Sequence, residues 1–141
     1  MTTWRVYFRT TDPADFVTAV YGNQSEPLSL TTTTSFYQNA LGGATAQPIN
    51  PLLLPTFPDL EFDSFVTIGL SQMANTAIGE NAPSTAASPA QDWSAAFEAG
   101  QDLIIDDIIG SLWFIYNGDS NGAPDADESV LLAQLTTDGD I

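Results

Sequence analysis

The amino-acid sequence predicts an all-β fold, an antiparallel β-sandwich of the jelly-roll kind with about seven short strands and one short helix. Short apolar and β-branched runs are separated by Gly, Pro, Asn and Asp, which is typical of such sandwiches. The crossover helices of a parallel α/β fold are missing. With 141 residues, 43% of them hydrophobic, the chain has the size of one ordinary domain, and we expect a single sandwich domain over residues 1–141.

The first half of the chain contains three predicted strands. Trp4, Val6 and Phe8 alternate with two arginines and a tyrosine, the period of an edge or half-buried strand with one buried face. Residues 16–21 form a β-branched, apolar run that ends at a Gly-Asn pair, and residues 28–34 are rich in threonine, which favours a pleated sheet.

The middle of the chain has a proline-rich segment followed by the clearest apolar alternation. Prolines and glycines within residues 40–58 exclude a long helix or a central strand there, and we expect the leucines of residues 52–54 to cover the core from a loop. Residues 61–70 predict a core strand, with Phe62, Val66, Ile68 and Leu70 on its buried face and Glu61, Asp63 and Thr67 on a polar back.

The second half begins with a predicted mobile surface loop at residues 71–91, rich in Ala, Ser, Thr and Pro. Asp92 can then cap a short helix that ends at Gly100 and carries Trp93 and Phe97, which we expect to cover one end of the core. Strands in residues 103–109 and 112–116 follow, and residues 131–135 complete the sandwich as a final strand, with a helix as the alternative. Within the first of them, Asp106 and Asp107 indicate a turn or bulge.

The charge of the chain excludes several classes of function. Eighteen acidic residues face two arginines, for a formal net charge of −16, and Lys, His and Cys are absent. Such a surface repels nucleic acid and anionic lipid, and no run is long enough to insert into a membrane. Catalysis by a Cys nucleophile, by a His base or on a His-bound zinc is excluded. We therefore expect no enzyme, because only carboxylate chemistry remains, such as a glycosidase pair formed by Glu61 and Asp63.

One motif indicates a ligand, and the predicted ligand is Ca²⁺. Residues 117–128 fit the spacing of a twelve-residue calcium loop with Gly122 at its turn. The predicted oxygen donors are Asn117, Asp119, Asn121, Ala123 through its carbonyl, Asp125 and Glu128. The preceding segment is a predicted strand rather than an entering helix, so a true EF-hand is not expected. A solvated acidic hairpin loop explains the same residues without a metal.

Three stretches of the chain carry a resemblance to a protein family. Residues 35–43, 60–70 and 117–137 resemble an uncharacterised β module of large secreted and cell-surface proteins of marine Bacteroidetes. The resemblance implies export by type IX secretion, an extracellular location and repeated neighbouring modules, and it implies no catalytic residue. Extreme acidity with almost no basic residues also suits a marine, high-salt setting. Residues 136–141 look like the start of a turn, which favours a segment of a longer surface protein.

These observations predict a non-catalytic structural or adhesive module of a secreted or cell-surface protein, with Ca²⁺ as a stabilising ion. The main alternative is a carbohydrate-binding module, in which aromatics such as Tyr7, Tyr21, Tyr37 or Trp93 stack on sugar rings. A third possibility is a subunit of an extracellular filament, whose open strand edges accept neighbouring copies of the same module.

Overall fold

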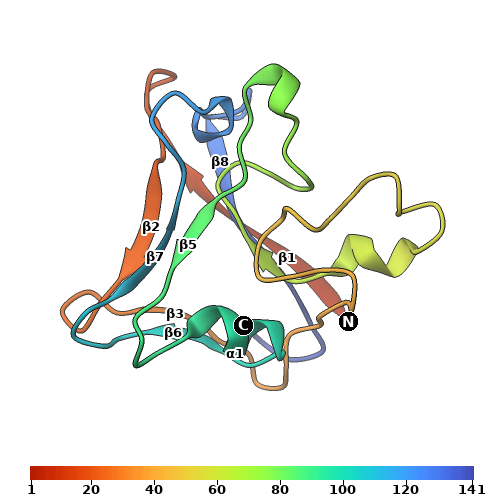
Figure 1. Ribbon diagram of the computed structural model, residues 1–141, viewed down its shortest axis with the longest axis vertical. Coiled ribbons are helices and arrows are strands. Elements are labelled where there is room, and N and C mark those ends of the chain that lie inside the picture. The colour runs from red at the N-terminus through yellow and green to blue at the C-terminus, as the bar shows by residue number, and fades with distance from the viewer.

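The computed structural model describes residues 1–141 and confirms the all-β sandwich (Figure 1). The chain forms eight strands, one α-helix and three short 3₁₀ turns. In order, the strands are β1 (Thr2–Arg9), β2 (Ala19–Gly22), β3 (Leu28–Leu30), β4 (Phe65–Val66), β5 (Ser84–Ala86), β6 (Leu103–Ile105), β7 (Ser111–Phe114) and β8 (Ser129–Thr137), and the helix is α1 (Trp93–Glu98).

The strands form three small antiparallel sheets. The first sheet has the order β1-β8-β4, the second β2-β7-β5, and the third is the pair β3-β6. Strand β8 is the longest and lies between β1 and β4, so both of its edges are hydrogen-bonded and nearly all of its residues are buried. Strand β1 pairs with β8 alone and forms an edge of the molecule.

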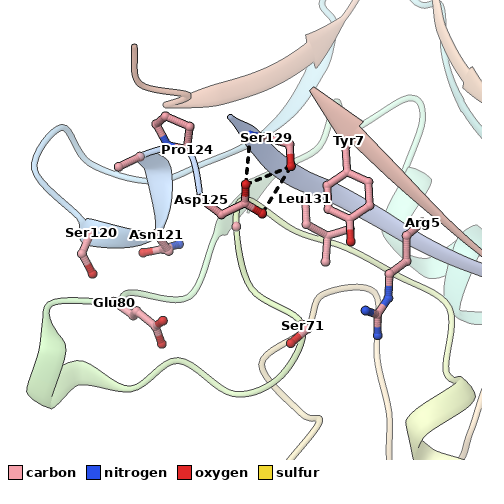
Figure 2. Close-up of a pocket in the computed structure, with 12 residues that line it drawn as sticks. Arg5, Tyr7, Ser71, Glu80, Ser120, Asn121, Pro124, Asp125, Ser129 and Leu131 are labelled. Atoms are coloured by element: carbon pink, nitrogen blue, oxygen red, sulfur yellow. Dashed lines mark hydrogen bonds between the residues drawn. The ribbon is translucent and has the colours of Figure 1, made fainter. Parts of the chain in front are cut away.

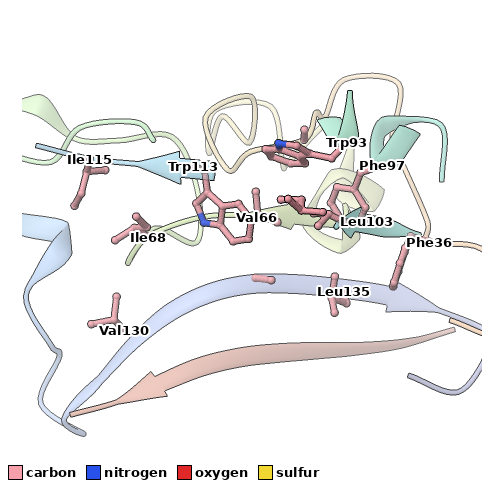
Figure 3. Close-up of a cluster of buried hydrophobic side chains, with 13 residues drawn as sticks. Phe36, Val66, Ile68, Trp93, Phe97, Leu103, Trp113, Ile115, Val130 and Leu135 are labelled. Carbon is pink, nitrogen blue, oxygen red and sulfur yellow. The ribbon is translucent and has the colours of Figure 1, made fainter. Parts of the chain in front are cut away.

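The main core fills the space between the first sheet and the layer made by β6, β7 and α1 (Figure 3). Its two tryptophans, Trp93 of α1 and Trp113 of β7, pack with ring centroids 5.5 Å apart. The indole Nε1 of Trp113 donates a hydrogen bond of 2.9 Å to the carbonyl of Thr67, which ties β7 to the segment after β4. The core therefore joins the two layers by packing and by a buried hydrogen bond.

The predicted helix is confirmed with the predicted cap. The carboxylate of Asp92 accepts a hydrogen bond from the amide of Ala95 at 3.2 Å, which satisfies a free donor of the first turn. Gly100 follows the helix with φ of +79°, a conformation that glycine adopts at helix ends without a steric cost. Both aromatic residues of α1, Trp93 and Phe97, are buried as expected.

The prediction of one strand over residues 61–70 is wrong for most of that segment. Pro58 begins a 3₁₀ helix that runs to Phe62, and only Phe65–Val66 form a strand. The 3₁₀ turn changes the alternation of side chains, so Phe62 is exposed and Asp63 is fully buried. The polar back predicted for this segment does not exist, because Asp63 and Thr67 lie inside the protein.

The flanking loops are more ordered than their composition indicates. Within residues 71–91, Thr76–Ile78 form a 3₁₀ turn and Ser84–Ala86 form β5, which pairs with β7. The predicted surface loop thus includes a sheet strand, and its mobility stays a prediction. In the proline-rich segment, Leu53 and Leu54 pack against a second, smaller core cluster, whereas Leu52 is exposed.

Candidate functional site

A polar cleft of about 390 Å³ lies on the outer face of the first sheet, beside the two loops 71–81 and 117–125 (Figure 2). Strands β1 and β8 form one wall, and the loops form the other. The side chains that give the cleft its chemistry are Arg5, Tyr7, Glu80, Asp125 and Ser129. The cleft therefore combines one guanidinium, one aromatic ring and two carboxylates within reach of solvent.

The β1 wall is positioned by its pairing with β8. Arg5 lies opposite Gln134, and Tyr7 lies opposite Leu131, so both side chains point to the outer face of the sheet. The guanidinium Nε of Arg5 donates a hydrogen bond of 3.1 Å to the Gln134 side-chain oxygen. This bond holds the charged group against the sheet while leaving its other donors free.

Asp125 has its carboxylate fixed by its own turn. One oxygen accepts hydrogen bonds from the amides of Asp127 at 2.9 Å and Ser129 at 3.0 Å, and the Ser129 hydroxyl adds bonds of 3.1 and 3.2 Å. The bonds from Ser129 and Asp127, with the charge of Arg9, hold the pKa of this carboxyl below its usual range. Asp125 is therefore an ionised acceptor at neutral pH.

Asn121 is the most buried member of the predicted calcium loop and joins three segments. Its Nδ2 donates to the carbonyls of Ile68 at 2.7 Å and Asn81 at 3.1 Å, and its Oδ1 accepts from the Asn81 amide at 3.0 Å. The segments approach so closely that a Cβ added at Gly69 would overlap the Asn121 carbonyl oxygen. Asn121 thus acts as a structural link in this arrangement.

The other predicted calcium donors lie apart from the cleft or at its edge. The two oxygens of Asp119 accept hydrogen bonds from Asn81 Nδ2 at 2.7 Å and from the Tyr116 amide at 2.8 Å. Glu128 is exposed with φ of +57°, Asn117 is exposed, and Ala123 lines the cleft. No group of three or more acidic side chains lies close enough to hold a metal ion. Calcium binding stays a prediction.

Next to the cleft, the whole of β1 is open to solvent. All eight of its residues are exposed, and Trp4, Val6 and Phe8 are 52, 36 and 51% exposed. The sequence predicts an edge or half-buried strand here: the edge is confirmed, and the buried face is wrong. These three side chains do point to the core side of the sheet, because their partners on β8 are the buried residues Leu135, Ala133 and Val130. No strand beyond β1 covers them.

The free edge of β1 presents a row of backbone groups, and the pairing of β1 with β8 shifts its register by one residue of β8 between Val6 and Tyr7. The Thr136 carbonyl accepts a hydrogen bond from the Tyr37 amide on the side of β8 that faces away from β1. The carbonyls of the neighbouring residues Leu135 and Thr137 therefore face β1, where their partners are Trp4 and Thr2. At the other end, the Thr10 amide donates to the Glu128 carbonyl. Backbone groups alternate in direction along a strand. Those of the odd-numbered residues Thr3, Arg5, Tyr7 and Arg9 therefore point away from β8 toward solvent.

Two shallow apolar grooves continue the uncovered face under β1. One of about 420 Å³ lies beside Phe8 and is lined by Phe16, Val17, Val20 and Leu132 among others. The second, of about 400 Å³, lies beside Trp4 and Val6 and is lined also by Leu135 and Ile141. The edge of β1 thus combines free hydrogen-bonding groups with an adjacent apolar surface.

Only some of the other residues predicted to bind a ligand are exposed in the structure. Tyr7 and Tyr21 are exposed, whereas Trp93 is buried in the core, so the prediction that Trp93 could stack on a sugar is wrong. The two carboxylates suggested for a glycosidase pair also separate, since Glu61 is exposed on a 3₁₀ helix and Asp63 is buried. As predicted, Asp107 forms a turn, in which its carboxylate accepts a hydrogen bond of 2.7 Å from the Gly110 amide.

Sequence reasoning missed how the cleft is assembled. Glu80 and Ser71, which come from the predicted surface loop, line the same cleft as Arg5 and Tyr7 of β1. No local pattern predicts that such distant segments share a cleft. Comparison with protein families, curated proteins and solved structures finds no match. None of the helices has the length and apolar character needed to cross a membrane.

Proposed function

We propose that this chain is a non-catalytic structural or adhesive module of a secreted or cell-surface protein, and that its working surface is the open edge of β1. The observation that carries the proposal is the contrast between β8, which is buried, and its neighbour β1, all of whose residues are exposed. Soluble proteins usually protect such an edge, because it pairs readily with another chain.

Strand addition is the association that fits this edge best. An added strand would hydrogen-bond to the outward backbone groups of β1, and its apolar side chains would cover Trp4, Val6 and Phe8. Backbone bonds then supply affinity, and alternate side chains supply specificity. An extracellular location is supported by the resemblance of residues 35–43, 60–70 and 117–137 to a surface-protein module.

The experiment uses a fluorescent peptide with the sequence of residues 2–9 as an extended-strand probe, and fluorescence anisotropy as the readout. A scrambled peptide of equal composition measures non-specific attraction to the acidic chain. Tyr7→Pro removes one outward amide without removing a bond to β8, and Tyr7→Ala is its matched control. We expect binding to the parent and to Tyr7→Ala, and none to Tyr7→Pro. Equal binding of both peptides to all three proteins contradicts the proposal.

A carbohydrate-binding module is the second candidate, and one observation favours it. Tyr7 is exposed at the wall of a cleft that also holds Arg5 and Asp125, and an aromatic ring beside polar groups is a common way to bind a sugar. A glycan panel tests this candidate. Tyr7→Ala should abolish a sugar response while leaving strand addition intact, so the same variant separates the two functions.

Calcium at residues 117–128 is a separate proposal, and it is supported by the spacing of the oxygen donors and by the negative charge of the chain. Millimolar Ca²⁺ should raise the melting temperature by about 5 °C if its Kd is about 0.1 mM. Magnesium and sodium chloride at matched ionic strength are the controls. If Asp119→Ala and Glu128→Ala respond to Ca²⁺ as the parent does, the segment is an acidic turn.

A further inference from the structure

The residues of β1 determine which partner fits its open edge. Both arginines of the chain, Arg5 and Arg9, are among the odd-numbered residues of β1. This edge is therefore the basic part of a molecule with a net charge of −16. Because β1 itself carries no acidic residue, two β1 strands can meet without placing carboxylates opposite each other. The opposite face of the same strand carries Trp4, Val6 and Phe8, which a second copy would cover with the same apolar side chains.

We propose that the occupant is a second copy of this chain, paired antiparallel with the first through β1 about a two-fold axis at Val6. This inference rests on the proposed function and names its partner. A two-fold contact is self-complementary, because each copy offers the same strand to the other. The register of the pairing then decides which side chains of the two copies face each other.

Two requirements select the register. Paired residues share a face of the sheet, so the apolar row must align with the apolar row, and a shift by one residue would set it against the arginines. Like charges directly opposite each other are destabilising. A register centred on Arg5 places Arg5 against itself, and one centred on Tyr7 places Arg5 against Arg9. The register centred on Val6 avoids both and pairs the strand from Thr3 to Arg9, whereas registers centred on Trp4 or Phe8 pair a shorter part of β1.

In the Val6-centred register, both faces are complementary. On the apolar face, Trp4 of one copy lies opposite Phe8 of the second copy, and the two Val6 side chains meet at the axis. On the outer face, Arg5 lies opposite Tyr7 of the second copy, where a cation–π contact is favourable, and Thr3 lies opposite Arg9. The odd-numbered residues that form these outer pairs are also the residues whose backbone groups point away from β8. Each of their four pairs can exchange two hydrogen bonds, so about eight new backbone hydrogen bonds can form.

The charges beside the contact are compatible with it. Arginines of the two copies are diagonal neighbours in this register, about 7–8 Å apart. Asp125 lies close enough to Arg9 for their charges to interact, and Asp125 and Glu80 line the same cleft as Arg5, so acidic groups accompany the basic row. The remaining charge of −16 on each copy opposes association over longer distances. Dimerisation should therefore strengthen as salt is added, because screening shortens the range of this repulsion.

Single cysteines test the register, since the chain has none of its own. In a non-hydrogen-bonded antiparallel pair the Cα atoms lie about 4.5 Å apart, within the range of a disulfide. Val6→Cys should therefore cross-link to itself on mild oxidation in about 0.5 M NaCl. Trp4→Cys and Phe8→Cys should each fail to cross-link with itself, because like residues are then about 14 Å apart, but a mixture of the two should cross-link.

Ile108→Cys, at a side chain that is 83% exposed on a distant turn, is the matched control for random collisions. Melting curves of all variants confirm that each is folded. Sedimentation of the cysteine-free chain, with and without Val6→Lys, gives an independent readout: we expect a salt-strengthened dimer that the lysine abolishes.

The outcomes separate this inference from the proposed function. If Val6→Cys cross-links no faster than Ile108→Cys while the strand peptide still binds, the second copy is the wrong partner and strand addition stands. If neither cross-linking nor peptide binding occurs, both proposals fail. Self-cross-linking of Arg5→Cys, with none of Val6→Cys, would contradict the register.

Discussion

Trp4 and Leu135 lie opposite each other on β1 and β8, yet Leu135 is fully buried and Trp4 is 52% exposed. Two large apolar side chains on the same face therefore contribute differently to stability. Leu135→Ala should lower the free energy of unfolding by about 2–5 kcal/mol, because it leaves a cavity in the core. Trp4→Thr should change it by about 1 kcal/mol or less. Urea denaturation measures both, and equal losses would show that the face of β1 is covered in solution.

A buried carboxylate should give the protein an unusual pH dependence. Asp63 has no exposed surface, and its oxygens accept hydrogen bonds from the amides of Asn39 at 2.6 Å and Gly43 at 3.1 Å. The pKa of this carboxyl is raised to about 6, chiefly because burial disfavours the charged form; the two amides lower it in part, and the charge of Glu98 raises it. The folded chain therefore holds the proton more tightly than the unfolded chain.

The sign follows from linkage between protonation and folding. The stabilisation is fully present below the unfolded pKa of 3.8 and is lost as the pH rises through about 6. We expect the free energy of unfolding to fall by about 2 kcal/mol from this group between pH 4 and pH 7. Relief of general repulsion has the same sign, so Asp63→Asn, which keeps the other acids, is the control. An identical pH slope in parent and variant would contradict the prediction.

Local sequence patterns predicted some parts of the structure correctly and others wrongly. The cap at Asp92 and the strand at residues 131–135 were predictable, because capping and alternation are local properties. Residues 61–70 were not, because Pro58 starts a 3₁₀ turn that changes which side chains face the core. The exposure of Trp4 was also unpredictable. An apolar alternation shows which face a strand offers, and only the tertiary arrangement shows whether another layer covers it.

A substitution at Asn121 distinguishes a structural role of this side chain from a role as a calcium ligand. Its Nδ2 donates to two buried or half-buried carbonyls, those of Ile68 and Asn81. Asn121→Asp keeps oxygen donors for a cation but removes both hydrogen-bond donors and adds a charge. We expect it to lower the free energy of unfolding by about 2–4 kcal/mol without Ca²⁺. Thermal melts with and without Ca²⁺ measure this, and a variant as stable as the parent would contradict the structural role.

The charge of the chain gives a further prediction about partners. Two arginines cannot replace counterions around a polyanion when eighteen carboxylates share the surface. We expect no saturable binding to DNA, RNA or anionic vesicles at about 0.15 M salt. Electrophoretic mobility and vesicle co-sedimentation measure this. Salt-sensitive, saturable binding in either assay would show that the β1 arginines form a polyanion site.

Residue-resolved amide hydrogen exchange shows whether β1 is an open edge that accepts another strand. At low protein concentration, the outward amides of Thr3, Arg5, Tyr7 and Arg9 should exchange fast, while the amides that bond to β8 stay protected. At high concentration in about 0.5 M NaCl, the four outward amides should gain protection together, because a second β1 then accepts their hydrogen bonds. If all β1 amides are protected at every concentration, or the outward four never gain protection when copies or the strand peptide are added, β1 is not an open edge that accepts a strand.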